Sequence, residues 1–191
     1  MGRWQPDARG RLMQAAFALY GERGFEQTTV AEIAERAGLT ERTFFRHFAD
    51  KREVLFAGAE ALQEVLVSTV AEAPGSLAPI DAAAAGLEAA GAFIQEGGDL
   101  ARQRQAIIAS SAELQERELI KLASLAAALA EALRERGVED PAASLTAEAG
   151  IAVFKVAFER YVEESNQRDL PRLIRESLEQ LKAVAAGRIV G

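Results

Sequence analysis

The chain has 191 residues, of which 49% are hydrophobic and 27% are charged, as expected for a globular protein with a buried core. It contains no cysteine and one histidine, which excludes disulfides, cysteine-based zinc sites and cysteine nucleophiles. No apolar run approaches the roughly 20 residues of a membrane span, and no signal-peptide pattern opens the chain. We therefore expect a cytoplasmic protein.

The net charge of −7 is unevenly distributed along the chain. Residues 1–56 contain nine Lys and Arg against eight Asp and Glu, whereas the remainder contains 13 basic and 21 acidic residues. The acidic excess therefore lies outside the amino-terminal part. If that part binds DNA, it must use a local basic patch, and its affinity must fall steeply with salt.

Ala, Leu, Glu and Arg dominate and β-branched alternation is almost absent, so we predict an all-α fold of about nine helices. The first spans about residues 7–23, with apolar side chains at helical spacing. Thr29, followed three residues later by Glu32, predicts the capped start of a short second helix. Gly38 then supplies a turn, and Thr40 caps a short third helix.

Asp50 and Glu53 repeat the capping pattern, and no Pro or Gly linker follows before Pro74. We therefore expect a long, continuous fourth helix that joins an amino-terminal domain rigidly to the rest of the chain. Five more helices are predicted at about residues 80–96, 99–109, 112–136, 141–164 and 171–186. The sequence thus predicts two helical domains, residues 1–53 and residues 54–191.

Two short helices on either side of Gly38 form a helix-turn-helix pattern, which presents its second helix to the major groove of DNA. Phe44 and Phe48 face the small core, and the opposite face of that helix carries Glu41, Arg42, Thr43, Phe45, Arg46 and His47. Arg42 is placed to pair with a guanine and Thr43 to touch a thymine methyl group or a phosphate. Helix starts at Thr29 and Thr40 offer hydroxyl and N–H groups to phosphates, and Lys51 adds a positive charge.

The stretch from Gly24-Phe25 to Leu55 resembles the DNA-binding head of the TetR (tetracycline-repressor) family. The matching residues are Thr28-Thr29, Ile33-Ala34, Ala37-Gly38-Leu39-Thr40, Thr43-Phe44-Phe45, His47-Phe48 and Lys51. The resemblance implies a homodimeric transcription factor, usually a repressor, whose divergent carboxyl-terminal domain often binds a small molecule that loosens DNA binding.

The resemblance also implies roles by position. Backbone contacts fall to Thr29, Thr40, Phe45, His47 and Lys51, and base or nearby phosphate contacts to Glu41, Arg42, Thr43 and Arg46. The family usually has a tyrosine where this chain has Phe45, and that tyrosine commonly gives its hydroxyl to a phosphate. Phe45 cannot make this contact, although its ring can pack on a sugar or a thymine methyl group.

The last two predicted helices indicate an interface. The eighth is apolar nearly all round, so one side fits the core of the monomer and a second side fits a partner helix. A two-fold pairing would build a four-helix interface, which the resemblance also implies. The paired heads would then meet major grooves about 34–36 Å apart, on a roughly palindromic operator.

An effector site is predicted in the middle of the carboxyl-terminal domain. Its candidate residues for a small apolar ligand are Phe93, Gln105, Phe154 and Phe158. The alternative is a tightly packed core, with polar side chains such as that of Gln105 in solvent.

Other functional classes fit the sequence less well. With His47 as the only histidine and no cysteine, neither a Cys-His pair nor a His-rich metal site can form, and we expect no enzyme activity, no cofactor and no metal. The sequence therefore predicts a DNA-binding transcriptional regulator, a repressor that a small molecule releases from its operator. The alternative is a helical protein-interaction module of the same fold, without DNA binding or without an effector.

Overall fold

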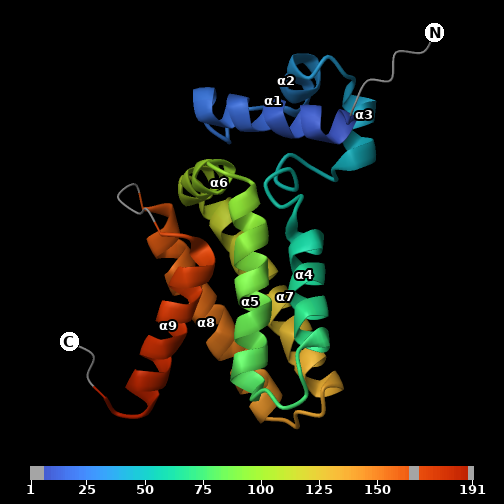
Figure 1. Cartoon of the computed structure of the whole chain (residues 1–191). Helices are drawn as coiled ribbons and strands as arrows, with labels where there is room; N and C mark the ends of the chain where they lie inside the picture. The colour runs from blue at the N-terminus through green and yellow to red at the C-terminus, as the bar shows by residue number, and fades with distance from the viewer. Residues whose placement is uncertain (1–6, 164–167, 189–191) are drawn as a thin grey trace. The chain divides into compact units, whose positions relative to one another are not determined.

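The computed structural model describes residues 7–163 and 168–188. Within this part the chain forms nine α-helices and no strand (Figure 1), which confirms the predicted all-α fold. The helices are α1 Ala8–Arg23, α2 Val30–Arg36, α3 Glu41–His47, α4 Ala59–Glu72, α5 Pro79–Glu96, α6 Leu100–Ala109, α7 Ala112–Glu135, α8 Ala142–Val162 and α9 Leu170–Ala185. None of these helices is long and apolar enough to cross a membrane.

The described residues form two compact units. The head unit consists of residues 7–58 and 102–118, and the body unit is the rest of the described chain. The head unit therefore extends beyond the predicted domain of residues 1–53, because it also contains most of α6 and the amino-terminal part of α7.

In the head unit, α1 packs on both α2 and α3 around a core that includes Phe17, Ile33 and Phe44. The predicted start of α2 is confirmed. The Thr29 hydroxyl accepts a hydrogen bond from the Glu32 N–H at 3.3 Å, and the Glu32 carboxylate accepts one from the Thr29 N–H at 2.9 Å.

The turn between α2 and α3 is also the predicted one. Gly38 has a φ of 64°, a left-handed conformation that costs glycine little and strains other residues. The Thr40 hydroxyl accepts a hydrogen bond from the Thr43 N–H at 3.2 Å and so caps α3.

The prediction of a continuous fourth helix from Asp50 is wrong. The Asp50 carboxylate does accept hydrogen bonds from the N–H groups of Arg52 and Glu53, but residues 51–58 form turns and α4 begins only at Ala59.

Tertiary packing explains the interruption. Val54, Leu55 and Phe56 are consecutive and all buried in the head core, whereas successive residues of a helix point about 100° apart and do not all face one side. Two carbonyls of this segment are bound by distant side chains. The guanidinium of Arg104 donates to the Leu55 carbonyl at 2.8 Å, and that of Arg9 donates to the Ala57 carbonyl at 2.6 Å.

In the body unit, α5 packs against α4, α8 and α9. Its contact with α4 is close because Gly86 lacks a side chain: a Cβ there would lie 2.6 Å from Val70 Cγ2. Polar contacts join α9 to α5 at both ends. Lys182 pairs with Asp81 at 3.0 Å, and the Gln95 side-chain oxygen accepts a hydrogen bond from the Leu170 N–H at 2.9 Å.

Candidate nucleic-acid interface

The third helix has one buried side and one outward side. Phe44 is fully buried and Phe48 nearly so, and both belong to the head core. The outward side carries six residues. Glu41, Arg42, Phe45 and Arg46 are exposed, and Thr43 and His47 are partly exposed. The structure thus brings together on one short helix all six predicted DNA-binding residues of α3.

Phe45 is an unusual part of this outward side, because its large apolar side chain remains 54% exposed. Its ring meets the buried ring of Phe44 edge to face, with centroids 5.5 Å apart. This contact supports the ring from below and leaves its outer surface open to an apolar partner.

The two capping threonines are exposed, as predicted, but their hydroxyls already take part in the head's own hydrogen bonds. The Thr29 hydroxyl lies 2.9 Å from a Glu32 carboxylate oxygen, and the Thr40 hydroxyl lies 3.1 Å from that of Thr43. Their positions at helix starts remain suitable for phosphate, provided that these local bonds are shared or exchanged.

Lys51 has a structural position that the sequence did not indicate. Its ammonium group donates to the carbonyls of Phe25 at 2.9 Å, Glu26 at 3.3 Å and Thr28 at 2.9 Å, and it lies 4.4 Å from the centroid of the Phe25 ring. An ammonium has three N–H groups, so these carbonyls occupy all of its donors. Lys51 therefore holds the loop between α1 and α2, and its predicted phosphate contact would have to compete with this role.

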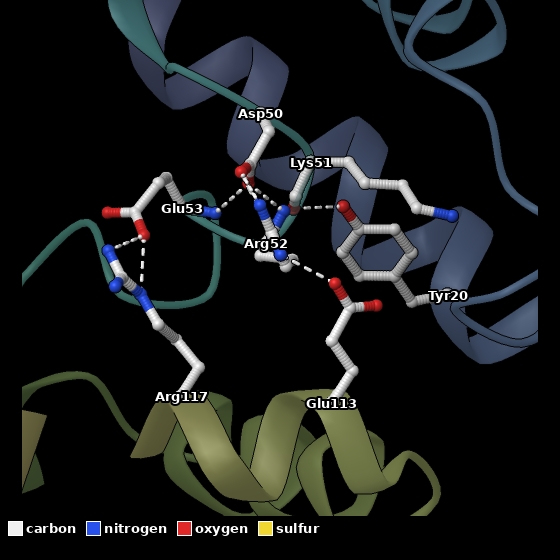
Figure 2. Close-up of polar contacts among 7 residues, drawn as sticks. All are labelled: Tyr20, Asp50, Lys51, Arg52, Glu53, Glu113 and Arg117. Carbon is white, nitrogen blue, oxygen red and sulfur yellow. Dashed lines mark hydrogen bonds and ion pairs between the residues drawn. The ribbon is translucent and has the colours of Figure 1, made fainter. Parts of the chain in front are cut away.

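The residues around Lys51 form a polar cluster (Figure 2). The Tyr20 hydroxyl donates to the Lys51 carbonyl at 2.6 Å. Partial burial acts to raise the pKa of Asp50, but hydrogen bonds from the Arg52 side chain and from the N–H groups of Glu53 and Arg52 outweigh it and lower that pKa. Asp50 is therefore held as a carboxylate by the segment that it caps.

The same cluster contains two residues of α7 that sequence reasoning missed. Arg52 pairs with Glu113 at 2.5 Å, and Arg117 pairs with Glu53 at 2.5 Å (Figure 2). In the sequence, Glu113 and Arg117 look only like opposite charges one helical turn apart. That pattern is typical of a solvated helix face, so their partners could be found only in the folded chain.

The predicted effector residues belong to both units. Phe154 is buried in the body core and Phe158 is partly buried beside it, with ring centroids 5.9 Å apart. Phe93 is 36% exposed, and Gln105 belongs to the head unit. The effector site therefore stays a prediction, and Phe154 and Phe158 are a pair within it whose rings stack.

Comparison with known proteins decides the family. The model for bacterial regulatory proteins of the tetR family matches residues 12–57, and the model for the MftR C-terminal domain matches residues 77–186, more than half of the chain. The chain belongs to the TetR family. This family comprises DNA-binding transcriptional regulators, which confirms the predicted class, and neither the family nor the relatives below are enzymes.

Individual relatives match only part of this TetR-family chain. The HTH-type transcriptional regulator TcmR of Streptomyces glaucescens is 34% identical over 89 residues, which cover 47% of this chain and 39% of TcmR. The HTH-type transcriptional repressor KstR2 of Mycobacterium tuberculosis is 43% identical over 47 residues, which cover 25% of this chain and 24% of KstR2. The chain thus spans less than half the length of these curated relatives.

Solved structures share the fold of the TetR-family chain over nearly its whole length. SmeT of Stenotrophomonas maltophilia, in complex with triclosan, has a TM-score of 0.66 at 22% identity. The aligned region covers 93% of this chain and 90% of SmeT. The fatty acid degradation regulator FadR of Bacillus halodurans has a TM-score of 0.64 at 17% identity. The aligned region covers 94% of this chain and 96% of FadR. At such identities the similarity establishes the fold.

Proposed function

We propose that this TetR-family chain is a dimeric repressor that reads a roughly palindromic operator with α3 and leaves it when a small molecule binds. The observation that carries the proposal is the outward side of α3, where Arg42, Phe45 and Arg46 are all exposed above a packed core. Exposed guanidinium groups on a helix that fits the major groove can pair bidentately with guanine.

The predicted contacts divide into two kinds. Arg42, Thr43, Glu41 and Arg46 read bases or touch nearby phosphates. Thr29, Thr40 and His47 meet the backbone, as does Lys51 when a phosphate competes with the loop carbonyls for its ammonium group. Phe45 packs on a sugar or a thymine methyl group in place of the family's tyrosine hydroxyl. In this proposal residues 1–53 supply the DNA contacts, and residues 54–191 supply ligand binding and dimerisation.

Dimerisation through α8 and α9 is supported by apolar side chains that the monomer leaves uncovered. Leu145, Ala149, Ala152 and Val156 follow one another along α8 at intervals of four, three and four residues, the spacing of a helix-pairing seam. Leu145 is 65% exposed, and Val184 on α9 is 68% exposed. Because α8 and α9 pack together, the two helices can offer one self-complementary surface to a second copy.

The effector is proposed to be small and apolar. SmeT, which shares the fold, is described in complex with triclosan, a small molecule. Phe154 and Phe158 are the strongest candidates to contact such a ligand, with Phe93 and Gln105 as further candidates. A protein with these partners, DNA and a diffusible effector, would act in the cytoplasm.

The test is selection of genomic fragments by the purified chain, followed by gel shifts of the recovered fragment at low and moderate salt. We expect retardation at low salt that weakens steeply as salt rises, and a palindromic sequence common to the fragments. The matched control is the double variant Arg42→Ala, Arg46→Ala, which should lose the band. If the native chain retards no fragment at low salt, the chain is a protein-interaction module instead.

A further inference from the structure

The turn between α2 and α3 has to hold α3 at one angle if that helix reads bases. Hydrogen bonds to base edges need donor–acceptor distances of about 2.7–3.2 Å, so a small rotation of α3 would break them. Arg42, a proposed base reader, lies only four residues after Gly38. Glycine has the greatest backbone freedom of all residues, and helices as short as α2 and α3 have little stability of their own. The turn therefore needs a restraint from elsewhere in the head.

Arg11 of α1 supplies such a restraint. Its guanidinium donates to the Ala37 carbonyl and lies 3.5 Å from the Gly38 carbonyl oxygen. The last carbonyls of a helix lack partners within the helix, and the helix dipole makes that end negative, so a cation is favoured there. Arg11 is partly buried in this position, although it is 26 residues from Ala37 in the chain. It thus ties α1 to the two residues at which the chain turns from α2 towards α3.

Gly38 leaves room for this guanidinium. A Cβ at Gly38 would lie 2.9 Å from an Arg11 guanidinium nitrogen, so a side chain there would have to displace the arginine. Two backbone hydrogen bonds close the same turn, from the Leu39 N–H to the Ala34 carbonyl at 2.8 Å and from the Gly38 N–H to the Glu35 carbonyl at 2.9 Å. The guanidinium and these two bonds together hold the turn.

We propose that Arg11 is a positioning residue for operator reading, because it fixes the turn between α2 and α3 and so the angle at which α3 meets the bases. The proposal rests on the proposed function and concerns the head unit alone. In this role the guanidinium binds carbonyls of its own chain. Arg11 therefore contributes to the choice of DNA sequence, and the salt dependence of binding does not come from it.

Arg36 provides a control with the same charge. It also joins α2 to α1, but its guanidinium bonds the Glu22 carboxylate, at 2.8 and 2.9 Å, instead of a carbonyl of the turn. Replacing either arginine by methionine removes one positive charge from the head. A difference between the two variants therefore reports the contact with the turn and not the change in net charge.

The first measurement is affinity across a range of salt concentrations, for the selected genomic fragment and for random DNA of equal length. Arg11→Met should lower the ratio of the two affinities roughly tenfold, because the turn loses a charged hydrogen bond, and the salt slope should stay native. Arg11→Lys keeps a cation that can donate to the same carbonyls, so it should recover most of the ratio. Arg36→Met should keep the native ratio.

The second measurement is amide hydrogen exchange of the full chain without DNA. Arg11→Met should speed exchange of the Leu39 N–H roughly tenfold, because the turn opens more easily. The reference is the Gly24 N–H, which bonds the Tyr20 carbonyl at 3.0 Å at the end of α1 and should exchange at its native rate. If Arg11→Met does not fold, Arg11→Gln must show the same contrast between the two groups.

Three results would overturn the proposal. A salt slope reduced by about one, with equal loss on fragment and random DNA, would identify Arg11 as a phosphate contact. An unchanged affinity ratio would leave Arg11 without a role in sequence reading, and equal acceleration at Leu39 and Gly24 would reveal only a general loss of stability. A native chain that binds no fragment would refute the proposed function, whereas the exchange contrast would still decide whether Arg11 holds the turn.

Discussion

At the scale of single residues, the basic side chains of the head divide by what they touch. Lys51 donates to three carbonyls of its own chain, whereas Arg42 is exposed on the outward side of α3. The charge of Lys51 thus stabilises the head, whereas the charge of Arg42 is open to an external partner. Substitutions at the two positions should therefore affect different measurements.

Arg42→Ala should relax specificity at one base pair of the operator and weaken binding by roughly 1–3 kcal/mol, because a bidentate contact with guanine is lost. The measurement is gel-shift affinity of native and variant chains for the selected fragment and for its single-base variants. Thermal unfolding should be unchanged, since the side chain is exposed. Equal loss on every base variant would show that Arg42 contacts only phosphate.

Lys51→Met should lower the free energy of unfolding by roughly 2–3 kcal/mol, because the carbonyls of Phe25, Glu26 and Thr28 lose a charged donor. Urea unfolding of the full chain measures this change, with Arg42→Met as the control that should leave stability intact. A variant of native stability whose DNA affinity merely depends less on salt would instead identify Lys51 as a phosphate contact.

At the scale of elements, the segment of residues 51–58 shows where local pattern and packing disagree. Asp50 and Glu53 form the start of a helix as the sequence predicts, but the burial of Val54, Leu55 and Phe56 bends the chain into turns until Ala59. Arg9 and Arg104 then bind carbonyls of the segment. The element depends on side chains that lie about 50 residues away on either side, which no local pattern reports.

The pH dependence of stability should reveal the contribution of Asp50 to this segment. Its pKa is lowered in the folded chain, so its stabilising effect is complete above its unfolded pKa and is lost as pH falls through the folded value. Asp50→Asn should therefore be less stable than the native chain at pH 7, and the gap should close below about pH 4. Urea unfolding of both chains across this range measures the gap; a gap of constant size would contradict the assignment.

At the scale of the whole molecule, the proposed function requires two heads on one operator and therefore two chains. Val156→Glu should convert the dimer to a monomer, because it would place a carboxylate in the proposed apolar interface at a cost of roughly 3 kcal/mol, more than a hundredfold in dissociation constant. Analytical ultracentrifugation measures the change. Ala127→Glu, on an exposed face of α7, is the matched control and should remain dimeric. A dimer that survives Val156→Glu would place the interface elsewhere.

The sequence by itself determined the elements that depend on neighbouring residues. Capping at Thr29 and Thr40, the glycine turn at Gly38 and the apolar spacing of most helices are short-range effects, so eight of the nine helix starts were predicted to within two residues. The outward side of α3 followed from the same periodicity. Its role in DNA recognition was then a matter of chemistry and of resemblance.

Only the tertiary structure decided what the charged side chains of the head bind. Lys51 binds carbonyls of its own loop, the predicted long fourth helix begins only at Ala59, and the amino end of α7 bonds Arg52 and Glu53 through Glu113 and Arg117. The physical reason is common to all three, because each depends on residues far apart in the chain that meet only after the core has formed. Burial of Val54, Leu55 and Phe56 overrides the local helix pattern, and a guanidinium or ammonium group binds whichever acceptor the fold brings within about 3 Å, here between 23 and 64 residues away.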